Sequence, residues 1–230
     1  MGTRRPSPAL QRCMLRLILH RYPVQSWAGS ATSFETLIGT ILSQNTNDLN
    51  RDTAMNALKS RFEISPQALW HAPIDEVIEC IRPAGLYRVK APRIKEVSRI
   101  ILDRFDGDLD SVLKKKPDEA RSILMEFPGV GYKTADILLA FVAGKPTIPV
   151  DTHVMRISKR LGIVRKNARY EETRLALERM IPPRRRVAMH LSLIRFGREI
   201  CKAPNPLCPK CLVNLSCPSS RVKGGKPSHA

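Results

Sequence analysis

The amino-acid sequence predicts an all-α fold. Apolar residues recur at helical spacing, and no stretch of useful length alternates apolar and polar residues as a strand does. With 230 residues, 43% of them hydrophobic, the chain can bury the core of one compact unit or of two small lobes. Prolines divide much of the chain into segments of helical length, at Pro66, Pro73, Pro83, Pro92, Pro117, Pro128, Pro146 and Pro149.

The first predicted helix lies near the N-terminus. Its apolar residues follow the i, i+3, i+4, i+7, i+8 stripe of a helix packed on a core: Leu10, Cys13, Met14, Leu17 and Ile18. This region is also rich in arginine and has no acidic residue before Glu35, which is the composition of a mitochondrial transit peptide. We favour the packed helix because of the apolar stripe, and we expect Cys13 and Cys80 to be free core thiols.

Three further helices can be placed from caps and apolar runs. Ser33 is the expected N-cap of an apolar helix over residues 34–42, and residues 49–61 continue as a second helix. A third helix is predicted over residues 94–105, with Pro92 in its first turn, where proline is tolerated.

Residues 127–135, with the sequence Phe-Pro-Gly-Val-Gly-Tyr-Lys-Thr-Ala, indicate a hairpin between two helical stretches. Gly129 and Gly131 allow backbone conformations that other residues avoid, and they let main-chain N–H groups approach a ligand. A helix that begins near Tyr132 adds the positive end of its dipole, so the hairpin, Val130 included, is a candidate site for a phosphate group. A Pro-Gly-x-Gly turn alone is more often a plain connection between helices.

Four cysteines with the spacing C-x6-C-x2-C-x5-C lie close together near the C-terminus: Cys201, Cys208, Cys211 and Cys217. Four thiolates this close indicate one soft metal centre, either zinc or an iron-sulfur cluster. A zinc ribbon usually has two C-x2-C pairs, whereas here only Cys208 and Cys211 form one, which favours a 4Fe-4S cluster. The alternatives are a disulfide set or four unrelated buried thiols, although disulfides belong mainly to short secreted chains.

The chain carries a formal net charge of +18 and has a pI near 10.2. Its expected partner is a polyanion, and nucleic acid is favoured over a membrane because no apolar run approaches the roughly 20 residues that span one. We expect an intracellular protein that stays with the DNA, in the cytoplasm or nucleoid of a prokaryote or in the nucleus or mitochondrion of a eukaryote. The basic ends, residues 1–8 and 218–230, are predicted to be flexible tails.

The hairpin, the segment Val-Asp-Thr-His at residues 150–153 and the cysteine run occur in the order of one known family. From about Ser33 to Cys217 the chain resembles the endonuclease III family of DNA glycosylases, in the helix-hairpin-helix superfamily. The resemblance implies two helical lobes with a DNA-binding cleft between them. One is a helix-hairpin-helix barrel over residues 33–145. The other is an iron-sulfur cluster domain made of residues 9–32 and 146–217.

Lys133 and Asp151 are the catalytic residues that the resemblance implies. In the family, the matching lysine attacks C1′ of the sugar as the damaged base departs, and the Schiff base then permits β-elimination and strand cleavage. A place in the first turn of a helix and in a closed cleft favours the neutral amine that attacks. The Asp151 carboxylate would stabilise positive charge on the sugar and assist proton transfer. Asp151 is also a candidate N-cap of a helix running to Leu161.

The resemblance also implies residues that fill the gap left by a flipped base. Residues 43–46, Ser-Gln-Asn-Thr, offer suitable amides. Family members usually carry glutamine in this segment, and an alignment without gaps places Asn45, not Gln44, at the filling position. Leu86, in the segment Gly-Leu-Tyr, is either a wedge on the opposite strand or a core residue.

The implied function is that of a bifunctional DNA glycosylase and AP lyase of base excision repair. It would remove oxidised pyrimidines such as thymine glycol from double-stranded DNA, and it would act as a monomer. The cluster would order the loop after Cys201, so that Lys202 and Lys210 contact phosphates. One alternative is a mismatch glycosylase for thymine, uracil or adenine, whose members generally have tyrosine or serine at the position of Lys133. Another is a DNA-binding module without activity, in which Lys133 and Asp151 would be expendable.

Overall fold

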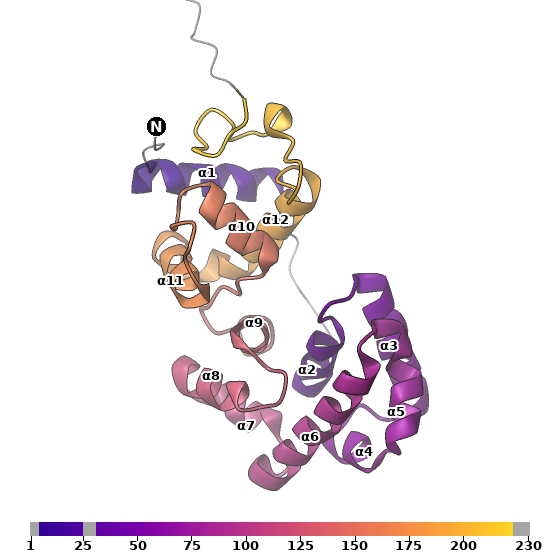
Figure 1. Cartoon of the computed structure of the whole chain (residues 1–230). Helices are drawn as coiled ribbons and strands as arrows, with labels where there is room; N and C mark the ends of the chain where they lie inside the picture. Colours follow the sequence, from indigo (N-terminus) through magenta and orange to yellow (C-terminus); the bar gives the residue numbers. More distant parts are fainter. Residues whose placement is uncertain (1–4, 25–30, 223–230) are drawn as a thin grey trace, which may run out of the picture. The chain divides into compact units, whose positions relative to one another are not determined.

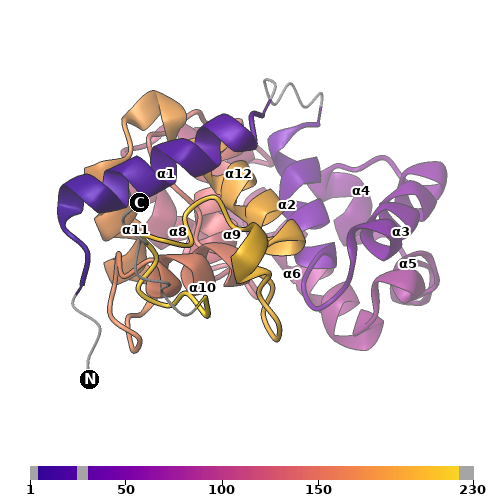
Figure 2. The same cartoon turned by 90° about the horizontal axis from the view of Figure 1, so that it is seen from above.

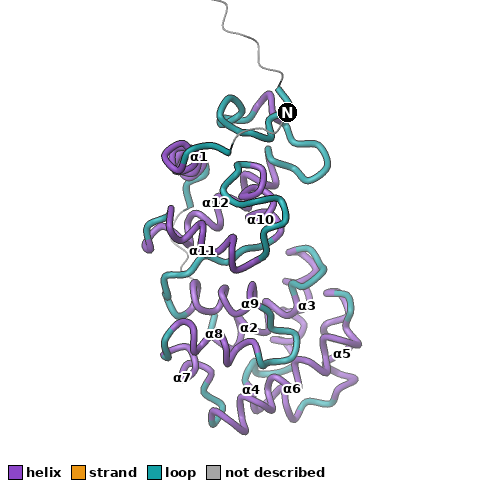
Figure 3. Tube along the Cα trace, turned by 60° about the vertical axis from the view of Figure 1, so that its left-hand side comes forward, coloured by secondary structure: helices purple, strands orange, loops and turns teal. Residues whose placement is uncertain are grey.

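The computed structural model of the chain describes residues 5–24 and 31–222, and every regular element in these ranges is a helix (Figure 3). The prediction of an all-α fold is therefore confirmed. Within the same ranges, no helix is long and apolar enough to cross a membrane.

The described residues form two compact units, each with its own hydrophobic core (Figure 1). The central unit comprises residues 31–145, and the terminal unit comprises residues 5–24 and 146–222. The elements of the central unit are α2 (Ser33–Leu42), α3 (Asp48–Arg61), α4 (Pro66–His71), α5 (Ile74–Ile81), η1 (Arg82–Ala84), α6 (Tyr87–Phe105), α7 (Leu109–Lys114), α8 (Pro117–Met125), α9 (Tyr132–Ile137) and η2 (Leu138–Val142). The elements of the terminal unit are α1 (Pro8–Arg21), α10 (Thr152–Arg160), α11 (Tyr170–Met180), η3 (Pro183–Arg185), α12 (Arg186–Glu199) and η4 (Cys208–Lys210).

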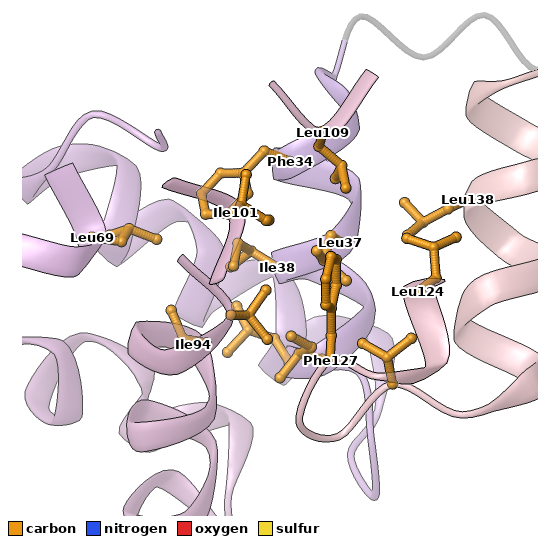
Figure 4. Close-up of a cluster of buried hydrophobic side chains, with 14 of the residues drawn as sticks. Phe34, Leu37, Ile38, Leu69, Ile94, Ile101, Leu109, Leu124, Phe127 and Leu138 are labelled. Atoms are coloured by element: carbon orange, nitrogen blue, oxygen red, sulfur yellow. The ribbon is translucent and has the colours of Figure 1, made fainter. Parts of the chain in front are cut away.

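Helix α2 lies inside the core of the central unit. Its apolar residues, Leu37 and Ile38 among them, are fully buried. Figure 4 shows Ile101 of α6 on one side of α2, and Leu124 of α8 and Leu138 on the other. Because α2 is packed from both sides, its C-terminal end is held firmly by its neighbours, and residues 43–46 leave the core from a fixed point.

A buried ion pair joins α8 to α9, the two helices that flank the hairpin. Nε of Arg121 lies 2.9 Å from Oδ1 of Asp136, whose side chain is fully buried. Arg121 also contacts the exposed carboxylate of Asp118 at 2.7 Å. The pair fixes how the two helices meet, and no local sequence pattern predicts it.

In the terminal unit, α1 packs against α12 (Figure 2). Oγ of Ser192 donates to the carbonyl of Tyr22 at 2.7 Å, just beyond the end of α1. The face of α1 that meets the core differs from the predicted stripe. Met14 and Ile18 are buried as expected, but Leu10, Cys13 and Leu17 are exposed, and the other buried residues are Gln11 and Leu15.

The burial of Gln11 explains why the predicted face of α1 is wrong. Its Nε2 atom donates to the carbonyls of Pro6 at 3.1 Å and Gly162 at 2.7 Å, so a polar residue is satisfied inside. The helix is therefore rotated relative to its most apolar stripe. Cys13 is not a core thiol, whereas Cys80 is buried as predicted.

Two predicted helix starts also need correction. Thr32, not Ser33, caps α2, because its hydroxyl accepts from the N–H of Glu35 at 3.1 Å. Helix α6 begins at Tyr87 rather than at residue 94, and Pro92 lies inside it instead of in the first turn. The turns before Pro92 are anchored by Lys90, whose buried ammonium donates to backbone carbonyls outside the helix.

Part of the predicted flexible tails is packed. The guanidinium of Arg5 donates to the carbonyls of Gly162, at 2.7 Å, and of Ile163. Pro6 and Pro218 both lie against Gly162, so residues from both predicted tails meet at this turn. Residues 1–4 and 223–230 of the predicted tails lie outside the described residues.

Candidate functional site

The hairpin between α8 and α9 is closed by a hydrogen bond from the N–H of Val130 to the carbonyl of Phe127, at 3.0 Å. Gly129 has φ +80°, and a Cβ there would lie 2.9 Å from Cδ of Arg93, so this position requires glycine. The expectation for Gly131 is wrong in part: its φ of −105° is open to any residue. A Cβ on Gly131 would meet no described atom within 4 Å, so the missing side chain instead leaves this face of the hairpin open.

Lys133 is the second residue of α9 and directly follows the exposed Tyr132. Its side chain is half-buried, while the next residue, Thr134, is buried in the central unit. The amine is therefore carried by the first turn of the helix, beside the open face of the hairpin. A group held on a rigid helix, partly out of water, suits a nucleophile better than a lysine on a mobile loop does.

Asp151 is the N-cap of α10, as the sequence predicted. Its Oδ1 atom accepts from the N–H of Val154 at 2.7 Å, and the described residues give its second oxygen no hydrogen bond. The two residues before it are braced by other elements. Nδ1 of His190 lies 2.9 Å from the carbonyl of Pro149, and the hydroxyl of Tyr170 accepts from the N–H of Val150 at 3.2 Å. The carboxylate is thus held in place at the start of α10.

His153 takes part in packing. Its Nδ1 atom lies 3.0 Å from Nη2 of Arg156, and a Cβ on Gly197 would come within 2.6 Å of the same ring nitrogen. Burial lowers the pKa of His153, and the nearby Arg156 acts in the same direction although Asp151 opposes it. A neutral imidazole that accepts from Arg156 fits these contacts.

The two predicted wedge segments both belong to the central unit, and their backbones share an unusual feature. Asn45 has φ +54° and is exposed, and Leu86 has φ +49° and is 54% exposed, so Leu86 is not a core residue. Gln44 is different, because its Nε2 atom donates to the carbonyl of Gly129 at 2.8 Å. The structure therefore ties Gln44 to the hairpin and presents Asn45 and Leu86 to solvent.

The four cysteines of the C-terminal run line one small cavity of the terminal unit. All are free thiols, so the disulfide alternative is not supported. Among the described residues, no group of three or more His, Cys, Asp or Glu side chains is placed to hold a single metal ion. Burial raises the pKa of the Cys211 and Cys217 thiols, so a bound cationic centre would have to keep them as thiolates.

Arg160 of α10 holds the loop that follows Cys201. Its guanidinium donates to the carbonyls of Lys202 at 2.7 Å and Ala203 at 2.8 Å, and Nη1 lies 3.3 Å from Sγ of Cys201. Lys202 and Lys210 are exposed on this braced surface. The sequence predicts both lysines as phosphate contacts but does not predict the role of Arg160, because no local pattern relates Arg160 to residues about 40 positions later.

Residues 38–183 match the family described as HhH-GPD superfamily base excision DNA repair protein. Endonuclease III of Thermotoga maritima is 38% identical over 213 residues, which cover 92% of this chain and 93% of that protein. Endonuclease III of Escherichia coli is 32% identical over 188 residues, which cover 81% and 84%.

Solved structures show the same relationship. A trapped endonuclease III-DNA covalent intermediate matches with a TM-score of 0.82 and 32% identity, covering 93% of this chain and 96% of that one. A thermostable thymine-DNA glycosylase matches with a TM-score of 0.76 and covers 92% and 96%, but its 20% identity shows a common fold alone.

Proposed function

We infer that this chain, which belongs to the endonuclease III family within the HhH-GPD superfamily of base excision DNA repair proteins, is a DNA glycosylase with lyase activity. The observation that carries the proposal is the position of Lys133, in the first turn of α9 directly after the hairpin. The central unit would be the helix-hairpin-helix barrel of the enzyme, and the terminal unit its iron-sulfur cluster domain.

In the proposed reaction, the neutral amine of Lys133 attacks C1′ of the damaged nucleotide. The bond from C1′ to the base breaks as the bond from Nζ to C1′ forms, and loss of the amine proton yields a Schiff base after the sugar ring opens. β-Elimination then expels the 3′ phosphate and cuts the strand. The open face beside Gly131 supports this assignment, because a DNA phosphate can approach the hairpin N–H groups there.

Asp151 supplies the negative charge. Its oxygen that does not cap α10 is available to stabilise the oxocarbenium-like sugar and to move protons to or from the amine. The bracing of Pro149 and Val150 by His190 and Tyr170 keeps this carboxylate in place before substrate binds.

Asn45 is the residue that fills the gap left by the flipped base. Gln44 donates its amide to the carbonyl of Gly129, whereas Asn45 is exposed in a left-handed conformation. Leu86, also exposed, would enter the opposite strand as an apolar wedge. A net charge of +18 supports binding of double-stranded DNA, to which Lys202 and Lys210 would contribute phosphate contacts.

The cofactor proposed for the terminal unit is a 4Fe-4S cluster held by Cys201, Cys208, Cys211 and Cys217. The four thiols line one cavity, and only Cys208 and Cys211 form the C-x2-C pair that a zinc ribbon would contain twice, which supports a cluster over zinc. When bound, the cluster would cross-link η4 to the loop after Cys201. No step of the base-removal chemistry depends on it.

The substrate class we propose is oxidised pyrimidines. The test is single-turnover cleavage of duplexes that contain one thymine glycol, one uracil, one T:G mismatch or one abasic site, analysed with and without alkali. Strand cleavage at thymine glycol without alkali is the expected result. Cleavage that requires alkali would indicate a monofunctional enzyme, and preference for T:G or uracil would indicate a mismatch glycosylase. Binding without any cleavage would indicate a DNA-binding module.

A further inference from the structure

We propose that Lys90 is a positioning residue that fixes the position of two DNA-probing loops relative to each other. These are the Asn45 loop, residues 43–46, and the Leu86 loop, residues 85–86. The inference rests on the proposed function, because the parts that these loops play on DNA are themselves proposals. It goes further by assigning their common orientation to one buried amine.

The contacts of Lys90 carry the argument. Its Nζ atom donates to the carbonyl of Leu42 at 2.7 Å and to the carbonyl of Ala84 at 2.8 Å. Leu42 is the last residue of α2, and Ala84 is the last residue of η1. The carbonyls at the end of a helix have no partner within it, and a lysine ammonium has enough donors to serve two of them. One side chain thus joins the two points from which the loops depart.

Both loops contain a residue in the left-handed region just beyond these points, a conformation that asparagine tolerates but that is costly for leucine. Among the described residues, only three that are not glycine have positive φ: Asn45, Leu86 and Asp106. Asp106 follows the end of α6 as an ordinary left-handed helix cap. Asn45 and Leu86 lie in the loops that follow the carbonyls held by Lys90. Such conformations persist where the surrounding structure fixes them, and Lys90 is placed to do so at both.

The burial of Lys90 argues against a role in packing alone. Its side chain is 1% exposed, and burial lowers its pKa. Filling this space with an amine is costly unless its hydrogen bonds are needed, since an apolar residue would fill it without the loss of hydration. Those hydrogen bonds go to the bases of the two loops.

Lys95, on the same helix, provides a matched control. Its Nζ atom donates to the carbonyls of Trp70, in the last turn of α4, and of Ala72, which directly follows that helix. Neither residue belongs to the two loops. Burial also lowers the pKa of Lys95. Lys95→Met therefore removes a similar pair of hydrogen bonds from the same unit without releasing Asn45 or Leu86.

The experiment compares Lys90→Met with Lys95→Met in two reactions of the full chain. One is single-turnover base removal from a thymine glycol duplex. The other is lyase cleavage of an abasic site in single-stranded DNA, which has no opposite strand and no gap to fill. For Lys90→Met we expect a loss of roughly 10- to 100-fold on the duplex, as for a misplaced catalytic contact, with the single-stranded reaction near the wild-type rate. For Lys95→Met the ratio of the two rates should stay unchanged.

An equal loss in both reactions for Lys90→Met, or no loss in either, would overturn the proposal. If that variant does not fold, a double-mutant cycle of Asn45→Ala and Leu86→Ala in the otherwise unchanged chain replaces it. If the two loops are held in fixed relative positions, the double variant should not lose the sum of the two single losses in ΔG‡ on the duplex. Additive losses would overturn the proposal. A wild-type protein inactive on both DNAs would refute the proposed function itself, whereas an active one with an unchanged rate ratio in Lys90→Met would refute only the role of Lys90.

Discussion

Oδ1 of Asp151 accepts a hydrogen bond of 2.7 Å from the backbone N–H of Val154. The residue that we expect to carry the catalytic charge is therefore also the N-cap of α10. The two roles can be separated, because an asparagine caps a helix about as well as an aspartate but carries no charge.

Asp151→Asn should keep the free energy of unfolding near its wild-type value and slow base removal by roughly 10²- to 10³-fold, the usual loss when one electrostatic partner is removed. Asp151→Ala should show a similar slowing and also lose about 1 kcal/mol of stability with the cap. Denaturant unfolding and single-turnover assays measure the two effects. An Asp151→Asn variant with normal turnover would show that the residue only caps.

The ion pair between Arg121 and Asp136 should contribute strongly to the stability of the hairpin region. Asp136→Ala leaves the guanidinium of Arg121 buried without its main partner, so we expect a loss of about 3–5 kcal/mol. Asp118→Ala removes the other carboxylate from the same arginine, but that side chain is 93% exposed, and little change should follow. Similar losses in the two variants, measured by urea unfolding, would contradict this assignment.

The wild-type protein should contain about four iron atoms and four sulfide ions per chain, as a 4Fe-4S cluster requires. Cys211→Ser should lower both contents and weaken the terminal unit, because it removes one of the four thiols that line the cavity. Cys13→Ser is the control, since that thiol lies on the exposed side of α1. Elemental analysis that found one zinc ion and no sulfide would rule out the cluster.

Stability should depend on the titration of Lys90. Burial lowers its pKa in the folded chain below the usual 10.5, so between the folded-state pKa and 10.5 the unfolded chain binds more protons. In that window the contribution of Lys90 makes the free energy of unfolding rise with pH, and below it the cost of burying the charged amine is constant. Lys90→Met should remove this rise. Unfolding curves for both proteins from neutral pH upward measure it, and equal slopes would show that the amine titrates normally.

Local patterns were enough to predict some features and not others. The cap at Asp151 and the helical spacing of Leu37 and Ile38 depend on neighbours in sequence, which the chain displays directly. The orientation of α1 depends on the hydrogen bond that the buried amide of Gln11 donates to the carbonyl of Gly162. Gly162 is far from Gln11 in the sequence, so no local pattern predicts this bond. The bonds of Lys90 to Leu42 and Ala84 likewise exist only once α2, η1 and α6 have packed.

In the candidate site, too, some residues follow from local sequence patterns and others do not. Motif spacing was enough to single out Lys133 and the four cysteines as candidate site residues. Arg160 and Tyr170 were missed, because they act on the backbone of residues that no spacing connects to them. The hydrogen bond from Gln44 to the carbonyl of Gly129, which supports our proposal that Asn45 fills the gap, could not be predicted from local sequence either.

The central claim is that Lys133 forms a Schiff base with DNA, and borohydride trapping on a duplex with one thymine glycol tests it most directly. The wild-type protein and a Lys114→Ala control, which alters an exposed lysine of the same unit, should both give a covalent adduct, and Lys133→Ala should give none. An adduct that persists in Lys133→Ala, or its absence from the wild-type protein, would contradict the account.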